Sequence, residues 1–444
     1  MTLLVISPDY ASHLYPLATL ATAWRDRGER VVIATGTATD ALVTAFGYER
    51  EHLQLGRGSN PGVIRAEEQP AGEDDSLRGF FEATRLGAVE TLAYQARARS
   101  VDLLWNAVGV ARAVQDVVAR TRPDTIIVDH LAFGARLGLA SSGTSHADVV
   151  LGHPSALTVG DEVYGYPPAW PRAFAPEPKA LAELRGLSEH VRDDFTAQWN
   201  AALAQLSPGA PPSRDAFAET GDVLLLNYPA ELHDPHRTSL LPRHTFLGSA
   251  ARTEAPDEQV EDWLARSEEP LIYVSLGSFL SARSDVLRTI ADALRRAELG
   301  AVIASGVTPP ADLGALPQGC VVRPYLPQIA ALRSCDVAIC HGGNNTAMEA
   351  LTAGLPVVAL PFSTDQFAVA ADLVDAGLGA AVEPNRASAD DLVAAVRVAL
   401  SPATTRRAAA VGRALRSVPG HERAARLLLR TAARRRSQRG PAPA

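Results

Sequence analysis

The stretch HGGNNTAMEALTAGLPVVALPFSTDQF, residues 341–367, decides the fold because it runs from one buried strand through a helix into the next strand. The apolar run DVAIC precedes it, NNTAMEALTAG predicts a helix that ends at Gly354, and PVVAL predicts the following strand. HGGN is therefore a turn from the carboxyl end of a strand into the amino end of a helix. Open parallel sheets bind their ligands at such turns.

This turn suits an anion. Its two glycines allow the backbone to approach a ligand closely, and the free N–H groups at the helix start carry about half a positive charge. The Asn345 amide and the Thr346 hydroxyl add neutral donors, and His341 can donate or carry charge, so a diphosphate could be held without a lysine. Taken alone, the turn is also typical of a plain strand-to-helix connection with Asn as the N-cap.

Neighbouring strand ends add further polar groups. Glu349, one helical turn later, can accept two hydroxyl hydrogen bonds of the kind a ribose offers, and the pair Asp365–Gln366 after PVVALP suits sugar hydroxyls. YLPQ, residues 325–328, offers an aromatic ring for a base and a Gln for its edge, and VSLGS, residues 274–278, ends near the expected phosphate. These strand ends present base, ribose, phosphate and sugar chemistry in one half of the chain.

Strands alternate with helices along the whole chain. LLVIS, RVVIAT and TIIVD alternate with helical patterns in the first half, and the alternation restarts after residue 270 with LIYVSL, AVIAS, CVVR, DVAIC and PVVAL. Continuous apolar strands between helices predict parallel sheets that are covered on both faces, so we expect an α/β protein with two doubly wound units. The predicted divisions are 1–248 for the first domain, 249–270 for a linker, 271–422 for the second domain, and 423–444 for a C-terminal helix, which could pack back on the first domain, and a basic, frayed tail.

Composition excludes several classes of protein. The 444 residues are 47% hydrophobic and 21% charged, and a net charge of −8 with interspersed Arg argues against nucleic-acid binding. The first residues enter a strand at once, without a signal peptide or a membrane-length apolar run, so we expect a cytoplasmic monomer or homodimer and no membrane partner. A single lysine, Lys179, excludes a P-loop nucleotidase and argues against a Schiff-base enzyme. Cys320, Cys335 and Cys340 lack metal or disulfide spacing, so we expect small buried residues.

The second half resembles the nucleotide-sugar domain of the inverting family 1 glycosyltransferases, of the bacterial natural-product and antibiotic type. The match runs through VSLGS, YLPQ, HGGNNTAMEA and a Pro followed by DQ, over residues 271–385. The resemblance implies the GT-B fold, in which two Rossmann-like domains face each other across a cleft, with a UDP- or dTDP-sugar donor and a small hydrophobic aglycone acceptor. The sequence departs from many relatives at Tyr325, where they have Trp, and at Asn344, which replaces the Trp of the plant signature.

The resemblance also assigns roles by motif position. Tyr325 would stack on the base, Leu326 and Gln328 would contact its edge, and Glu349 would hold the ribose. The residues assigned to the diphosphate are Ser278, His341, Gly343, Asn345 and Thr346. The residues assigned to the donor sugar are Asp365 and Gln366.

The first half supplies a candidate base. His13 follows the first strand in PDYASHLYPLATLA, where Ser12 replaces the Gly usual in the family, and Asp129 ends the strand TIIVD. A lone His at such a turn is often only a cap, but the resemblance matches Asp129 to the aspartate that orients the catalytic base. A His with a carboxylate behind it is a general-base arrangement.

Inverting transfer follows from this pair. His13 would take a proton from an acceptor hydroxyl, which would attack the anomeric carbon from the face opposite the nucleotide. No two aspartates are separated by a single residue, so the chain lacks a DxD metal clamp, and we expect neither a metal ion nor a cofactor. A sugar-nucleotide epimerase of the same fold and a non-catalytic partner that binds nucleotide-sugar are the alternatives.

Aromatic residues of the first half predict the acceptor pocket, because flat apolar aglycones suit aromatic walls. The candidates are Phe80, Phe81, Trp105, His153, Tyr164, Tyr166 and Trp170. GRGSNPG, residues 56–62, neither follows a strand nor opens a helix, so we interpret it as a flexible loop rather than a phosphate loop.

Overall fold

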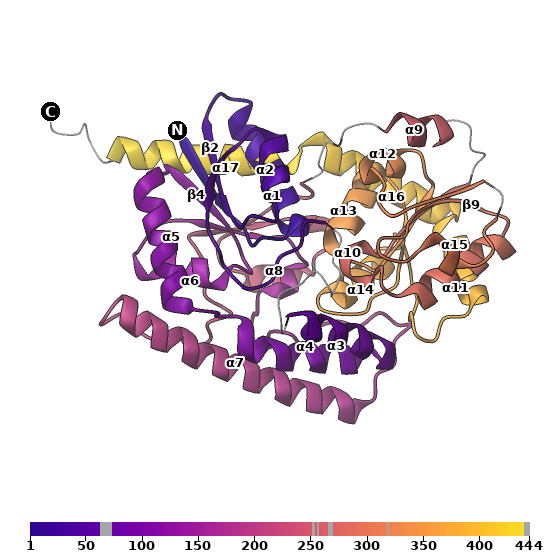
Figure 1. Ribbon diagram of the computed structural model, residues 1–444, viewed down its shortest axis with the longest axis horizontal. Coiled ribbons are helices and arrows are strands. Elements are labelled where there is room, and N and C mark those ends of the chain that lie inside the picture. The colour runs from indigo at the N-terminus through magenta and orange to yellow at the C-terminus, as the bar shows by residue number, and fades with distance from the viewer. Residues whose placement is uncertain (63–72, 251–253, 255–256, 265–269, 318, 439–444) are drawn as a thin grey trace.

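The computed structural model describes residues 1–62, 73–250, 254, 257–264, 270–317 and 319–438. It contains two sheets whose strand pairs are all parallel (Figure 1). Their strand orders are β3-β2-β1-β4-β5-β6-β7 and β10-β9-β8-β11-β12-β13. In both sheets the order reverses beside the first strand of the unit, β1 or β8, which is the doubly wound pattern that the sequence predicted.

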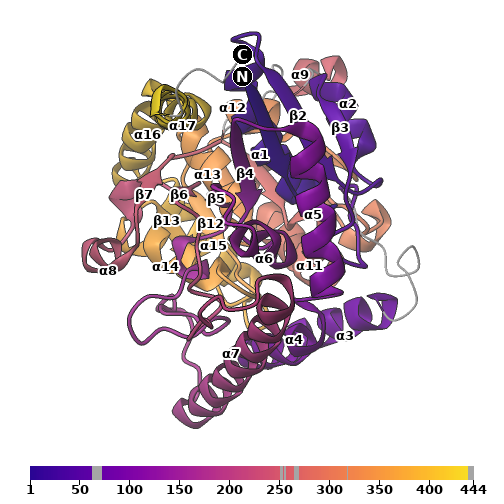
Figure 2. The ribbon, with the colours of Figure 1, turned by 90° about the vertical axis from the view of Figure 1, so that its left-hand side faces the viewer.

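The first sheet is built from apolar runs that are buried on both faces. Leu3, Leu4, Val5 and Ile6 of β1 are each 0% exposed, because α1, α2 and α17 cover one face while α5 and α6 cover the other (Figure 2). The elements of this half are β1 Thr2–Ile6, α1 Ala11–Arg25, β2 Arg30–Thr35, α2 Asp40–Phe46, β3 Glu49–His52, α3 Glu73–Leu86, α4 Ala88–Asp102, α5 Ala107–Thr121, β4 Thr125–Asp129, α6 Phe133–Ser141, β5 Ala147–Val150, α7 Pro178–Leu206, β6 Val223–Leu226, α8 Pro235–Leu240 and β7 His244–Phe246.

The second sheet follows the same physical pattern. Its helix α13 ends at Gly354, whose φ of 95° is a left-handed conformation that glycine adopts without strain. The three cysteines are free thiols, with Cys335 and Cys340 buried and Cys320 partly buried. The elements of this half are α9 Glu258–Leu264, β8 Leu271–Ser275, α10 Gly277–Leu280, α11 Ser284–Arg296, β9 Gly300–Ala304, β10 Cys320–Arg323, α12 Gln328–Arg333, β11 Val337–Cys340, α13 Asn344–Ala353, β12 Val357–Ala359, α14 Gln366–Asp375, β13 Gly379–Ala381, α15 Ala389–Ala399, α16 Pro402–Ser417 and α17 Gly420–Gln438.

The predicted linker, residues 249–270, is not wholly extended chain. It contains α9, whose Val260 and Leu264 are 4% and 7% exposed because they pack into the core of the second sheet. Helix α9 is only two turns long, so it could not be recognised from apolar periodicity in the sequence. Short helices give weak periodic signals.

Helix α17 returns from the second half to the first (Figure 1). Ala424, Ala425 and Leu428 join the core beside α1, and Arg27 Nη2 lies 2.8 Å from Glu422 Oε2. The helix continues to Gln438, so the basic run at 434–436 is helical rather than frayed, and residues 439–444 lie outside the described part of the chain. Within the described residues, none of the helices has both the length and the hydropathy needed to span a bilayer.

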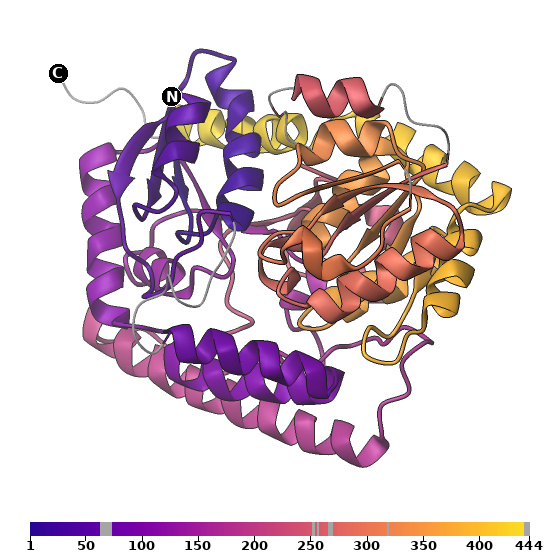
Figure 3. The ribbon, with the colours of Figure 1, turned by 45° about the vertical axis from the view of Figure 1, so that its right-hand side comes forward.

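A second connection runs through α3 and α4, which lie with α7 along one side of the molecule (Figure 3). The Thr84 carbonyl in α3 accepts hydrogen bonds from Arg283 Nη1 at 2.8 Å and from Asn385 Nδ2 at 2.9 Å. Arg283 is 2% exposed, so this contact is buried. Helix α3 therefore belongs to the first half in sequence but is bonded to the second half.

Candidate active site

A cavity of about 710 Å³ lies between the carboxyl ends of the two sheets. Residues from both halves line it, as a cleft between two doubly wound units requires. The predicted site residues in its wall are His13, Phe80, Asp129, Tyr164, Tyr166, Ser278, Tyr325, Leu326, Gln328, His341, Gly343, Asn345, Thr346, Glu349, Asp365 and Gln366. The described residues include no cluster of three or more His, Cys, Asp or Glu side chains that could hold a metal ion.

His13 and Asp129 are in contact. The distance from His13 Nδ1 to Asp129 Oδ2 is 2.7 Å, and Asp129 Oδ1 accepts the Leu131 N–H at 2.8 Å. Asp129 is 1% exposed, whereas the His13 side chain is 26% exposed toward the cavity. Burial alone would lower the pKa of His13, but the charge and hydrogen bond of Asp129 outweigh it, so the pKa is raised above its ordinary value.

The turn at the start of α13 is packed around His341. Gly277 and Gly342 both have positive φ, and a Cβ at Gly277 would lie 2.8 Å from the His341 ring. Burial lowers the pKa of His341 to about 4, so the ring is neutral near pH 7. The expectation that His341 could carry charge is therefore wrong, and positive potential at the turn comes from the N–H groups of α13.

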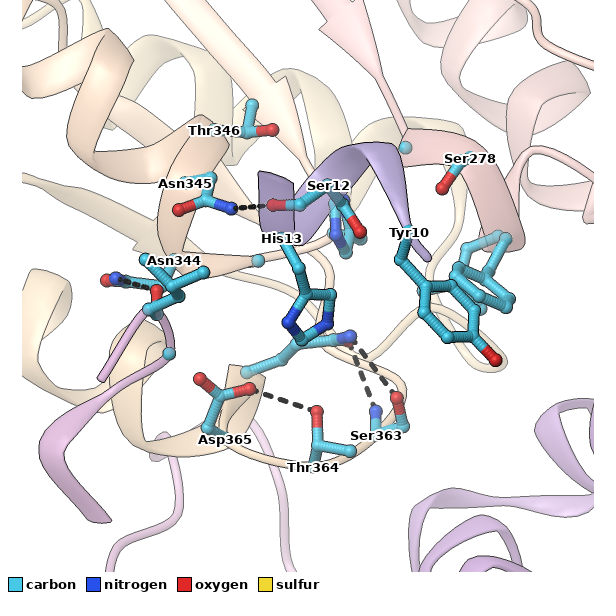
Figure 4. Close-up of a pocket in the computed structure, with 18 of the residues that line it drawn as sticks. Tyr10, Ser12, His13, Ser278, Asn344, Asn345, Thr346, Ser363, Thr364 and Asp365 are labelled. Atoms are coloured by element: carbon cyan, nitrogen blue, oxygen red, sulfur yellow. Dashed lines mark hydrogen bonds between the residues drawn. The ribbon is translucent and has the colours of Figure 1, made fainter. Parts of the chain in front are cut away.

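The two asparagines after this turn contact the first half. Asn345 Nδ2 donates to the Ser12 carbonyl at 2.9 Å (Figure 4). Asn344, which is 4% exposed, donates to the carbonyls of Leu151 at 2.7 Å and Asn227 at 2.9 Å. No role was predicted for Asn344 from the sequence. One N–H of the Asn345 amide is used by Ser12, and its second N–H, the Thr346 and Ser278 hydroxyls and the helix N–H groups are further donors in this wall.

The predicted base and ribose residues form a linked group. Gln328 accepts the Tyr273 hydroxyl at 2.8 Å and donates to Glu349, and both side chains are nearly buried. Tyr325 is 60% exposed, and its hydroxyl lies 3.5 Å from Glu254 Oε1. Leu326 is 2% exposed and packs mainly into the core.

Asp365 and Gln366 differ in their surroundings. Asp365 Oδ2 accepts the His153 N–H at 2.5 Å and Oδ1 accepts the Thr364 hydroxyl at 3.0 Å, on the side of the cavity that faces His13 (Figure 4). Gln366 Oε1 instead accepts two backbone N–H groups of its own loop, at 3.0 and 3.2 Å. The loop therefore uses the oxygen of the Gln366 amide, and Nε2 donates to Ser363 Oγ at 3.2 Å. The sugar contact predicted for Gln366 would thus have to come from its second amide N–H.

Four of the predicted acceptor residues do not line the cavity. Trp170 packs on Phe367 with ring centroids 4.6 Å apart, Trp105 packs beneath α5, and Phe81 packs with Leu77 of its own helix. His153 lies behind the wall, with Nε2 3.0 Å from Asp372 and Nδ1 accepting the Ser155 N–H. These four residues have structural contacts, whereas Phe80, Tyr164 and Tyr166 face the cavity.

The segment GRGSNPG also differs from its interpretation as a flexible loop. Asn60 is 0% exposed, forms a parallel bridge with Tyr10, and donates from Nδ2 to Ser278 Oγ at 3.2 Å. The loop thus joins the two halves beside a predicted phosphate contact. One signal was present in the sequence, since the residue before Pro61 favours the extended backbone that a bridge needs.

The profile of the family described as "UDP-glucoronosyl and UDP-glucosyl transferase" matches residues 187–408, half of the chain. The chain belongs to this family. The match covers every residue that the second half contributes to the cavity wall, from Tyr273 to Gln366. The resemblance inferred from the strand-end motifs is thereby confirmed.

The curated relatives of this chain include proteins named as glycosyltransferases. Demethyllactenocin mycarosyltransferase of Streptomyces fradiae is 28% identical over 286 residues, which are 63% of this chain and 57% of the relative. The NDP-glycosyltransferase YjiC of Bacillus licheniformis is 26% identical over 214 residues, 48% of this chain and 54% of the relative. The chain thus spans about half the length of the curated relatives it matches.

Solved structures match over nearly the full length. CalG4, the calicheamicin glycosyltransferase, has a TM-score of 0.68 at 19% identity, with 98% of each chain covered. VinC, a glycosyltransferase solved in complex with dTDP, has a TM-score of 0.67 at 18% identity, with 98% of this chain and 100% of VinC covered. These matches confirm the predicted GT-B fold.

Proposed function

We propose that this family member transfers a sugar from a UDP- or dTDP-sugar to a hydroxyl group of a small hydrophobic aglycone, with inversion at the anomeric carbon. The observation that carries the proposal is the 2.7 Å contact between His13 and Asp129 at a cavity whose opposite wall holds Asp365 and the start of α13. The names of the mycarosyltransferase and of CalG4 support a secondary metabolite as acceptor. The dTDP complex of VinC supports a nucleoside diphosphate donor.

The base acts through its outer nitrogen. Because His13 Nδ1–H donates to Asp129, Nε2 keeps the lone pair that removes the acceptor proton. The acceptor oxygen then forms a bond to the anomeric carbon as the bond from that carbon to the diphosphate oxygen breaks. The imidazolium that results is stabilised by the buried Asp129 carboxylate.

The leaving diphosphate is stabilised without a metal ion. N–H groups at the start of α13 and the Thr346 hydroxyl face the place where its negative charge develops. Tyr325 supplies a stacking surface for the base, and Glu349 accepts the ribose hydroxyls. Neutral His341 packs beside this turn and fills the space that Gly277 leaves.

The test is product analysis. Purified protein is incubated with UDP- and dTDP-α-glucose and a panel of phenolic and polyketide acceptors, and products are identified by mass spectrometry and NMR. We expect a β-glycoside of a hydroxyl group, and its formation in stoichiometry with free nucleoside diphosphate. An α-linked product would contradict inversion, and an isomerised donor formed without acceptor would indicate an epimerase.

A further inference from the structure

The cavity contains a single permanent cation among the described residues that line it. That cation is Arg99 of α4, and the other titratable side chains in the wall are acidic residues, histidines and tyrosines. Arginine keeps its charge at every working pH. A lone guanidinium in a partly buried wall therefore favours a negatively charged occupant on its side of the cavity.

Aromatic stacking fixes the position of this guanidinium. Phe195 and Phe217 stack with centroids 4.1 Å apart and planes 11° apart, and Phe217 stacks on Tyr164 at 3.9 Å and 8°. The Arg99 Cζ atom lies 5.3 Å from the centroid of the Tyr164 ring. The column orders Arg99 through a cation–π contact, so little side-chain entropy is lost when a ligand binds.

The donors of Arg99 have no anionic partner within the described residues. Its guanidinium forms neither an ion pair nor a hydrogen bond to them, although many surface arginines of this chain are paired. Gln95, one helical turn earlier, lines the same cavity, and its Oε1 is buried without a hydrogen-bond partner. A planar fork of donors beside an amide acceptor matches a ligand that carries a carboxylate and a hydroxyl group.

The location of Arg99 separates it from the diphosphate. A Cβ built at Gly165 would lie 3.4 Å from Arg99 Nη1 and 4.0 Å from the Ser188 hydroxyl, so the neighbours of the guanidinium belong to the first half. The start of α13 instead contacts Ser12, and Ser278 contacts Asn60. The guanidinium thus faces the side of the cavity that Phe80, Tyr164 and Tyr166 line.

We infer that the acceptor is an anionic aromatic aglycone whose carboxylate is bound by Arg99. Its ring packs against Phe80 and Tyr166, and its reacting hydroxyl lies at His13. This inference rests on the proposed function, because it assigns the aromatic end of the cavity to the acceptor. Arg99 is then a specificity-determining residue that selects acids over their neutral analogues.

Binding of matched acid and ester pairs tests the inference without any sugar transfer. The probes are hydroxylated naphthalene, xanthone and anthraquinone carboxylic acids, each with its methyl ester, and their dissociation constants are measured by calorimetry in the absence of donor. We expect at least one acid to bind about tenfold to a hundredfold tighter than its ester. Arg99→Gln should abolish that preference and leave ester affinity unchanged, and Arg99→Lys should restore part of it.

Arg97→Gln is the matched control, because Arg97 lies on the same helix but is exposed and does not line the cavity. It should keep the preference for acid. The inference would be overturned if the wild-type protein bound the acid and the ester equally well in all three pairs, or bound neither. This outcome does not depend on whether Arg99→Gln folds. An Arg99→Gln protein that keeps the acid preference but binds UDP and dTDP more weakly would also overturn the inference, since Arg99 would then serve the diphosphate. The proposed function is tested separately, because its failure would appear as a lack of glycoside formation by the wild-type protein.

Discussion

Replacement of His13 by Ala removes the proposed base and leaves its partner in place. General-base catalysis contributes about 100-fold to 10,000-fold, equivalent to about 2.7–5.5 kcal/mol in the activation free energy. The Asp129 carboxylate, 1% exposed, would keep the Leu131 N–H but lose His13. We expect kcat/KM for transfer to fall within that range, and the free energy of unfolding to fall by about 1–3 kcal/mol because a buried acceptor loses a partner.

His13→Asn separates these two effects. The Asn side chain can donate an N–H to Asp129, so stability should be largely retained, but an amide cannot take up the acceptor proton. Both variants should lose transfer to a similar extent. The measurements are initial rates of glycoside formation with saturating donor, thermal unfolding, and UDP or dTDP affinity by calorimetry.

Nucleotide affinity distinguishes a role of His13 as base from a role in nucleotide binding. His13 lies on α1 of the first half, whereas the predicted base and ribose residues lie on the second half, so affinity should stay within about twofold of wild type. An equal loss of nucleotide affinity and of transfer in His13→Asn would refute the role of His13 as base. An Asn variant that transfers sugar at the wild-type rate would refute it as well.

The pH profile offers a second test: because Asp129 raises the pKa of His13 above its ordinary value of 6.5, the acid limb of kcat/KM should lie above pH 6.5, where protonation removes the base. Asp129→Asn should move that limb to lower pH while lowering the plateau, and an unmoved limb would assign it to another group. Transfer should also survive excess EDTA, since α13 N–H groups stabilise the diphosphate, and loss of activity restored by Mg²⁺ or Mn²⁺ would show that a metal takes part. Asp365→Ala should lower transfer from the native donor about tenfold or more while free nucleotide affinity stays within about twofold, because buried sugar hydroxyls would lose an acceptor. Gln366→Ala should act mainly on thermal stability, and an equal effect of both substitutions on donor choice would contradict the different surroundings of the two side chains.

Local sequence patterns predicted the strands and the positions of the turns at their carboxyl ends. TIIVD coincides with β4, and the turn before α13 lies where the buried run DVAIC ends. These features depend on periodicity and on turn chemistry, both of which are properties of neighbouring residues. Family-like motifs then placed His13 in the first turn of α1, which follows β1, and Asp129 at the end of β4. Because β1 and β4 are adjacent and parallel, their carboxyl ends lie side by side, which brings the two side chains into contact.

Contacts between the halves could not be predicted in the same way. Asn344 and Asn345 are adjacent in sequence, yet each bonds to backbone carbonyls more than 100 positions away. Which donors remain for a ligand depends on the placement of two sheets, and no local pattern encodes that placement. The prediction of acceptor-pocket residues from aromatic content was partly wrong for a related reason. Trp170 and Tyr166 occur in the same irregular stretch, but only Tyr166 faces the cavity.

The bonds between the halves connect the proposed base to the donor site. Asn345 donates a hydrogen bond to the carbonyl of Ser12, the residue before His13, and Asp365 accepts a hydrogen bond from the His153 N–H. A base must lie within hydrogen-bond reach of the acceptor hydroxyl, and misplacement by about 1 Å can cost about a hundredfold in rate. If His13 is the base, its position relative to the donor sugar depends on Asn345 and Asp365, residues to which the sequence assigned only donor binding. Substitutions in the turn before α13 should consequently be judged by transfer rate and by nucleotide affinity together, because either value alone would misassign their role.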